Sequence, residues 1–222
     1  MTFFETLQRE TEAERNALYA VPLVADALKG AVTRESYIAY LTQAYHHVRH
    51  TTPLLMTAGG RLTQKQNDIR KAFAEYIEEE IGHEEWILND IAACGADKEA
   101  ARQSCPNRAT ELMVAYAYDS VTRGNPISFL GMVFVLEGTS TSLATHAAET
   151  MMKALGLKRN CFNYLLSHGA LDIEHMKFFE KLVNTIDSAE DQQAIIHMAK
   201  TMFGLFADMF RSIPHTAQEM AA

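Results

Sequence analysis

The sequence predicts an all-α fold, and three observations support this prediction. The 222-residue chain contains only 5 Pro and 11 Gly, and most of them separate long segments rather than interrupt them. Within those segments apolar residues recur every three or four positions, which is the period of an amphipathic helix. No Asn-Gly pair and no sustained alternation of apolar and polar residues indicates a hairpin or a strand. We therefore expect a bundle of seven or eight helices.

Helix-start signals define the N-terminal part of this bundle. A first long helix is expected over residues 2–29. Thr33 is a suitable N-cap for a helix over 34–52, because its side-chain oxygen can accept a bond from a free backbone amide of the first turn. Pro53 lacks a backbone N–H and disfavours helix in the residue before it, so a separate short helix is expected over 54–60.

A capping box marks the next helix. Thr63 and Gln66 have the spacing at which each side chain bonds to the backbone amide of the other residue. The helical period then continues to about residue 93, and Gly95 follows as a stop signal. We expect one continuous helix over 64–93.

The C-terminal half carries signals of the same kind. Asn125 is a suitable N-cap, Pro126 suits the first position of a helix, and Ser188 can cap the last helix. No linker, repeat or shift of composition divides the chain, so we expect a single domain over residues 1–222. The helices expected in this half cover residues 108–123, 126–155, 161–186 and 189–211.

Composition excludes several classes of partner. The chain has 28 acidic and 20 basic residues, a formal net charge of −8, and no dense cluster of Lys or Arg. Nucleic acid and anionic membrane surfaces are therefore not expected as partners. The acidic N-terminus does not resemble a secretory signal, and the longest apolar run is about half of the ~20 residues that span a bilayer. Three scattered cysteines without a CxxC motif fit a reducing cytoplasm.

Two polar residues interrupt the apolar stripe of the expected 64–93 helix. Glu80 and His83 form an E-x-x-H pair in the middle of that stripe, and Glu79, one turn before His83, could take the place of Glu80. Burying a carboxylate costs several kcal/mol unless it is paired, protonated or bound to a metal. The apolar members of the stripe are Ile69, Phe73, Tyr76, Ile87 and Ile91.

Two further segments repeat this pattern. His168, Asp172 and His175 follow one another at spacings of four and three, which keeps them on one helix face among Leu and Phe residues. Glu137 is the only charged residue between Ile127 and Thr145. Three helices are therefore expected to direct acid or imidazole groups into an apolar interior.

Taken singly, each of these residues has a simpler explanation as a hydrogen-bonded core histidine or a glutamate paired with arginine. Together they favour a metal, because Lys and Arg are scarce in the three stripes. Carboxylate and imidazole ligands suit iron, manganese or zinc, and the absence of thiolate argues against a structural zinc site. A fourth helix should complete the ligands of one metal. Its candidates are His46, His47 and His50, and their spacing leaves open which one faces the interior.

On these residues the chain resembles the heme-oxygenase-like diiron oxidases and oxygenases. The resemblance covers residues 34–211 and is carried by EEEIGHEE (78–85), GMVFVLEGTS (131–140) and, above all, HGALDIEH (168–175). It implies a helical bundle of the heme-oxygenase-like type. The same fold occurs in heme oxygenase, in thiaminase-type hydrolases and in pyrroloquinoline-quinone synthase.

The resemblance also implies a set of ligands. Glu80 and His83 would bind one iron, Glu137 would bridge two irons, and His168, Asp172 and His175 would bind the second. The family often has a further carboxylate at the first iron, for which this chain offers Glu79 or Glu75 and, on the preceding helix, only histidines. The implied cofactor is two Fe(II) per chain, and the implied activity is oxidation or oxygenation of a small organic substrate by O2.

Two alternatives remain beside this interpretation. A metal-free enzyme of the thiaminase or quinone-synthase type would rely on a nucleophilic cysteine, yet none of the three cysteines shares a stripe with histidine and an acid. A noncatalytic helical binding protein would pair its buried acids with arginine. The sequence identifies neither the substrate nor the electron donor. The Met and Phe residues of the last helix would support a homodimer, although packing in the chain's own core is the simpler explanation.

Overall fold

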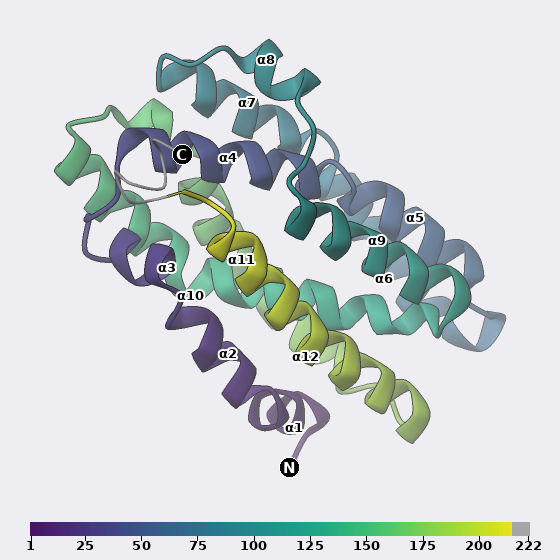
Figure 1. Cartoon of the computed structure of the whole chain (residues 1–222). Coiled ribbons are helices and arrows are strands. Elements are labelled where there is room, and N and C mark those ends of the chain that lie inside the picture. The colour runs from purple at the N-terminus through teal and green to yellow at the C-terminus, as the bar shows by residue number, and fades with distance from the viewer. Residues whose placement is uncertain (215–222) are drawn as a thin grey trace.

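The computed structural model describes residues 1–214, with the side chains of residues 170–173 outside the description (Figure 1). Within this part of the chain the regular structure is entirely helical, as the sequence predicts, but the expected number of seven or eight helices is wrong. The elements are α1 (Phe3–Glu10), α2 (Glu12–Tyr19), α3 (Pro22–Ala27), α4 (Arg34–Val48), α5 (Thr51–Arg61), η1 (Gln64–Gln66), α6 (Asn67–Glu80), α7 (His83–Ala93), α8 (Lys98–Gln103), α9 (Arg108–Arg123), η2 (Pro126–Ser128), α10 (Phe129–Leu155), η3 (Arg159–Cys161), α11 (Asn163–Val183) and α12 (Ala189–Arg211).

The expected first helix is divided into α1, α2 and α3. At the first break Thr11 leaves the helical region with φ −111° and ψ 7°, and its buried hydroxyl donates to the carbonyl oxygen of Leu7 at 2.7 Å. At the second break Pro22 occupies the first position of α3, where its missing N–H leaves no helical bond unmade. The structure therefore interrupts, at these two positions, a helical period that is continuous in the sequence.

The boundary between α4 and α5 lies earlier than predicted. Thr33 caps α4 by accepting from the amide of Ser36 at 3.0 Å, as expected. The chain turns at Arg49 and His50, and Pro53 lies in the first turn of α5 rather than ending the preceding helix. A proline is tolerated there because the first amides of a helix have no partner within it.

The expected helix over 64–93 is broken in its middle. Gly82 has φ +92°, a left-handed conformation that glycine adopts without steric cost, and it separates α6 from α7. Glu80 is the last residue of α6 and His83 is the first residue of α7. The E-x-x-H pair therefore spans a turn and does not lie along one helix.

The C-terminal helices match their expected ranges more closely. Helix α9 covers the predicted 108–123, and α12 covers 189–211 with Ser188 as its cap. The short helix α8, which Asp97 caps through the amides of Glu99 and Ala100, was not predicted.

Helix α10 forms the centre of the bundle and packs along α11 and α12 (Figure 1). At Gly131 a Cβ atom would lie 2.4 Å from the carbonyl oxygen of Ile195, so the two backbones approach closely there. Among the described residues one helix, Pro126–Leu155, is long and apolar enough to cross a membrane by length and composition alone. Its apolar window is 61% buried, which is typical of the core helix of a soluble protein.

The core also contains most apolar residues of the last helix. The buried ones on α12 include Met198, Met202, Phe203, Phe206 and Met209. They belong to the same hydrophobic cluster as residues of α4, α5, α7, α9 and α10. These side chains therefore stabilise the chain's own bundle.

Candidate metal centre

Glu80, His83 and His168 form the first cluster of the site. One ligand atom from each lies within 4.8 Å of those of the other two. The Nδ1 atom of His83 lies 3.1 Å from Oε2 of Glu80, and the two side chains are only 7% and 11% exposed. The turn at Gly82 brings the E-x-x-H pair together, and α11 adds His168.

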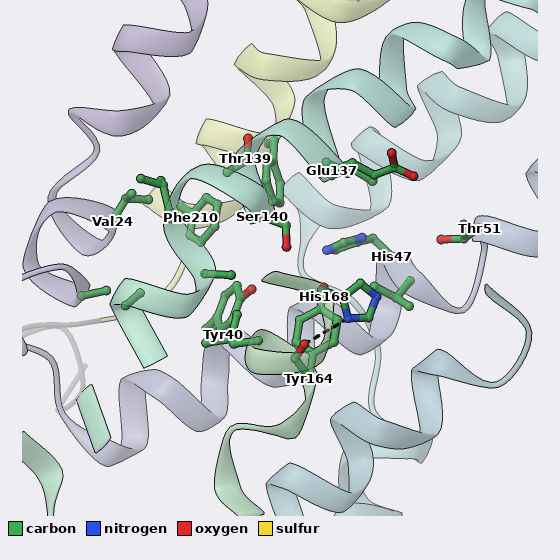
Figure 2. Close-up of a pocket in the computed structure, with 18 of the residues that line it drawn as sticks. Val24, Tyr40, His47, Thr51, Glu137, Thr139, Ser140, Tyr164, His168 and Phe210 are labelled. Carbon is green, nitrogen blue, oxygen red and sulfur yellow. Dashed lines mark hydrogen bonds between the residues drawn. The ribbon is translucent and has the colours of Figure 1, made fainter. Parts of the chain in front are cut away.

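The orientation of His168 is fixed by a hydrogen bond. Its Nδ1 lies 3.0 Å from the carbonyl oxygen of Tyr164 (Figure 2). A carbonyl oxygen only accepts, so Nδ1 carries the proton and Nε2 keeps its lone pair for a metal. The amide of Tyr164 in turn donates to Oδ2 of Asp90 at 2.8 Å, which joins the start of α11 to α7.

Trp86 supports the second imidazole of this cluster. Its ring stacks on the ring of His83 with a centroid distance of 3.9 Å and an interplanar angle of 29°, and it meets His168 edge-on at 5.7 Å. Sequence reasoning considered Trp86 only as an aromatic residue of a pocket wall, and it missed Tyr164. Trp86 lies three residues after His83 and Tyr164 four before His168, so helical spacing is the signal by which both supports could be found.

His175 is the centre of a second group. Its Nε2 lies 2.7 Å from Oε2 of Glu79, and its Nδ1 lies 3.7 Å from Oε1 of Glu137. The side chains of His175 and Glu137 are 11% and 12% exposed, whereas that of Glu79 is 56% exposed. The ring of Tyr76 packs edge-on against His175 at 5.8 Å. The side chain of Asp172, also predicted as a ligand, lies outside the described residues.

The grouping of the α11 histidines differs from the one that the resemblance implies. His168 belongs with Glu80 and His83 rather than with His175. The geometry of a helix explains this difference, because seven residues advance about 10 Å along the axis. Two imidazoles that far apart on one helix would bind two neighbouring metal ions rather than the same one. Asp172 lies between them in the sequence.

Among the three histidines of the preceding helix, His47 faces the interior. His46 bonds through Nε2 to the hydroxyl of Ser104 at 2.8 Å, and Nδ1 of His50 lies 3.1 Å from the hydroxyl of Tyr118. His47 is 3% exposed and lines the same pocket as His168. Burial, reinforced by the nearby His50, lowers its pKa to about 3, so its ring is neutral at physiological pH.

The carboxylates of the site have imidazole partners. Within the described residues the ion pairs of Glu79, Glu80 and Glu137 all join them to His83 or His175. Burial opposes ionisation of Glu80, but the hydrogen bond with His83 and the charge of His168 outweigh burial and lower its pKa. A carboxylate beside imidazoles is a donor set that fits ferrous iron.

An apolar pocket opens from this group of ligands. The cavity has a volume of about 160 Å³ and is lined by residues from α3, α4, α5, α6, α10, α11 and α12. Glu80, Glu137 and His168 line it, while Val24 and Phe210 lie on the side away from Glu137 and His168 (Figure 2). A small organic molecule could therefore lie directly beside the candidate ligands.

The fold and this arrangement define a class, namely all-helical proteins in which carboxylate and imidazole side chains converge beside a buried apolar pocket. The chain belongs to the family of iron-containing redox enzymes, whose model matches residues 38–207. No curated protein matches the chain in a sequence search.

Solved structures confirm the heme-oxygenase-like fold. A protein of unknown function from Shewanella denitrificans is 23% identical, with a TM-score of 0.84 over 96% of this chain and 92% of that one. A TenA homolog from Pseudomonas syringae pv. tomato has 9% identity and a TM-score of 0.77 over 95% and 91%. Heme oxygenase-1 from Synechocystis, in complex with heme, has 11% identity and a TM-score of 0.77 over 100% and 95%. At sequence identities this low, the similarity shows that the fold is shared and nothing more.

Proposed function

We propose that the protein is a nonheme diiron enzyme that uses O2 to oxidise or oxygenate a small organic substrate. Its membership of a family of iron-containing redox enzymes supports the use of iron. The observation that carries the proposal is the convergence of Glu80, His83 and His168, whose ligand atoms lie within 4.8 Å of one another.

The two groups of side chains would each hold one iron. Glu80, His83 and His168 would bind the first iron, and Glu137 and His175 would bind the second. Asp172 and Glu79 are the further carboxylates at hand, and Glu79 already contacts His175. Iron held by these residues would provide the electrons for the reduction of dioxygen.

The protein's own residues have three tasks in such a reaction. The carbonyl of Tyr164 and the ring of Trp86 hold the imidazoles of His168 and His83 in place. The apolar walls of the pocket exclude water from the reacting atoms. The pocket beside Glu137 positions the substrate next to the ligands.

The environment of the cysteines disfavours the metal-free alternative. Cys94 and Cys161 are buried at 2% exposure, and burial together with the adjacent Cys161 raises the pKa of Cys94 to about 12. A thiol with such a pKa is a poor nucleophile because the thiolate is the reactive form. Cys105 is exposed, and none of the three cysteines is among the described residues that line the pocket.

The noncatalytic alternative finds less support for a related reason. Such a protein would satisfy its buried acids with arginine, whereas the acids of this site face histidines. We further infer a cytoplasmic protein whose partners are O2 and a small molecule, with no nucleic acid or membrane among them. We also propose that the protein forms a homodimer. Light scattering would measure the molar mass in solution and so test this.

The proposal is tested by anaerobic titration of Glu80→Gln with Fe(II), followed by mixing with O2. Because the amide is a weak neutral ligand, we expect the variant to bind the first iron at least tenfold more weakly and to consume O2 more slowly. Glu78→Gln, an exposed position on the same helix, is the matched control and should behave as the wild type. Equal iron binding by Glu80→Gln and Glu78→Gln would contradict the proposed site.

A further inference from the structure

Asp90 is a buried acid that lies outside the set of candidate ligands. It belongs to α7, the helix that begins at His83, and it is fully buried. Its Oδ2 atom accepts from the amide of Tyr164 at 2.8 Å, whereas its Oδ1 atom has no hydrogen-bond partner among the described residues. Burying a carboxylate that is only partly satisfied opposes folding, so stability alone does not account for an acid at this position.

The start of α11 shows what Asp90 contributes. The first amides of a helix have no partner within it and are ordinarily capped by the side chain just before them. Here that residue is Phe162, with φ −130° and ψ 20°, and it provides no side-chain cap. The carboxylate of Asp90 reaches the amide of Tyr164 from a neighbouring helix instead. Helix α7 therefore supplies the cap that the local sequence of α11 lacks.

Tyr164 connects this cap to the candidate metal centre. Its carbonyl oxygen accepts from Nδ1 of His168 at 3.0 Å, and its ring centroid lies 4.6 Å from that of the imidazole (Figure 2). Both backbone groups of Tyr164 are thus engaged, the amide with α7 and the carbonyl with His168. A displacement of Tyr164 would change the direction in which Nε2 of His168 points.

The same contact joins the two helices that carry the imidazoles of the first cluster. Asp90 follows His83 by seven residues, which is two turns along the same face of α7. His168 follows Tyr164 by one turn of α11, and the ring centroids of His83 and His168 are 4.9 Å apart. Because hydrogen bonds are directional, a bond to one particular amide sets the register of the two helices close to this pair.

We propose that Asp90 is a positioning residue of the first metal site, which caps α11 through Tyr164 and so holds His168 in the orientation at which it meets the other two ligands of its cluster. This inference rests on the proposed function. It adds to that function a residue that touches no metal and on which the binding of the first iron depends.

The tautomer of His168 in the full-length protein, freed of metal with a chelator, tests the positioning role. NMR of the protein labelled with nitrogen-15 histidine should show His168 protonated at Nδ1, because the carbonyl of Tyr164 can only accept. The His168→Gln variant assigns this signal by its loss. We expect Asp90→Ala to lose the single tautomer and Asp90→Asn, which keeps an acceptor oxygen, to retain it. The wild-type tautomer in a folded Asp90→Ala protein would overturn the inference.

Anaerobic titration with Fe(II), with Mössbauer spectra to separate the sites, tests the effect on the metal. Asp90→Ala should bind the first iron at least tenfold more weakly, and Asp90→Asn should restore the wild-type affinity. The second iron should keep its affinity, because His175 lies three turns farther along α11 than Tyr164. Wild-type affinity of Asp90→Ala for the first iron would overturn the inference.

Asn107→Ala is the matched control for the loss of a helix cap. Asn107 caps α9 by accepting from the amide of Thr110 at 2.9 Å, so its removal should lower stability without changing the affinity for either iron. Equal weakening of both irons in Asp90→Ala, or equal effects of Asp90→Ala and Asn107→Ala, would indicate a general loss of stability and contradict the positioning role.

The two measurements separate this inference from the proposed function. A tautomer of His168 that depends on Asp90, in a protein that binds no Fe(II), would retain the positioning of His168 and contradict the diiron function. Fe(II) binding that is the same in wild type and Asp90→Ala would retain the function and contradict the inference. If Asp90→Ala fails to fold, Asp90→Ser, whose side chain is too short to reach the amide of Tyr164, takes its place in both measurements.

Discussion

Burial determines the chemistry of His47. The ring belongs to a run of three candidate histidines, but only the environment of each shows its role: His46 and His50 bond to hydroxyls, whereas His47 lies in the pocket. Desolvation disfavours its charged form and lowers its pKa from 6.5 to about 3. A neutral imidazole in an apolar pocket is suited to hydrogen bonding rather than to pairing with an anion.

The lowered pKa of His47 has a consequence for stability. Between pH 3 and pH 6.5 the unfolded chain binds a proton at this position that the folded chain does not, so stability rises with pH over this window and is independent of His47 above it. Acidification below pH 6.5 should therefore lower the free energy of unfolding of the wild type more steeply than that of His47→Leu, by up to about 1.4 kcal/mol per pH unit. Urea unfolding at pH 7, 6 and 5 measures both slopes.

His197→Leu is the control for this comparison, because His197 is exposed on α12. Its slope between pH 7 and pH 5 should equal that of the wild type. A His47→Leu slope no shallower than the wild-type slope would show that His47 takes up protons equally in both states.

Single residues of the site were predictable because each breaks an apolar pattern. Glu80, His83 and His168 interrupt stripes, and the structure brings these three together. How residues from different helices pair was not predictable from spacing, which describes one helix at a time. Asp90 gave no signal at all, since a lone acid in a helical segment is ordinarily exposed to solvent.

At the scale of elements, Gly82 shows where helical periodicity fails as a predictor. The residues around it are strong helix formers, and one glycine in such a segment is usually tolerated. Here the chain uses its left-handed conformation to end α6 and begin α7, which turns Glu80 and His83 toward each other. The site depends on this break, and the local sequence alone does not require it.

The close approach of α10 and α12 yields a prediction about packing. A methyl group at Gly131 would meet the carbonyl oxygen of Ile195 at 2.4 Å and the amide nitrogen of Ala199 at 2.8 Å, and backbone atoms cannot move aside as a side chain can. Gly131→Ala should therefore lower the free energy of unfolding by about 1–3 kcal/mol, measured by urea denaturation.

Gly204→Ala provides the matched comparison on α12. A Cβ atom there would have nothing within 4 Å, so the substitution should only reduce backbone freedom and raise stability by about 0.5–1 kcal/mol. Equal effects of the two substitutions would contradict the close contact at Gly131.

At the scale of the whole molecule, the sequence predicted the all-helical class because periodicity and the scarcity of breakers act along the entire chain. The number of helices was wrong because the backbone leaves the helical conformation at Thr11 and Gly82, within segments whose helical period is continuous. The central helix α10 belongs both to the core and to the pocket. Its apolar face forms the core, and Glu137 and Ser140 on the same helix line the pocket.

The organisation of the bundle explains how a dry interior can hold several charged groups. The candidate ligands come from α6, α7, α10 and α11, and each is supported by a residue of the same or an adjacent helix. Among the described residues the ion pairs of Glu80 and Glu137 are with histidines, in a largely apolar environment. Bound metal would thus stabilise the folded chain as well as provide reactivity.

The diiron assignment is tested by the iron content of the anaerobically reconstituted wild-type protein, measured by titration and Mössbauer spectroscopy. We expect two Fe(II) per chain in two nonequivalent nonheme environments, both oxidised on exposure to O2. A protein that binds no Fe(II), or that holds iron only as heme, would contradict it.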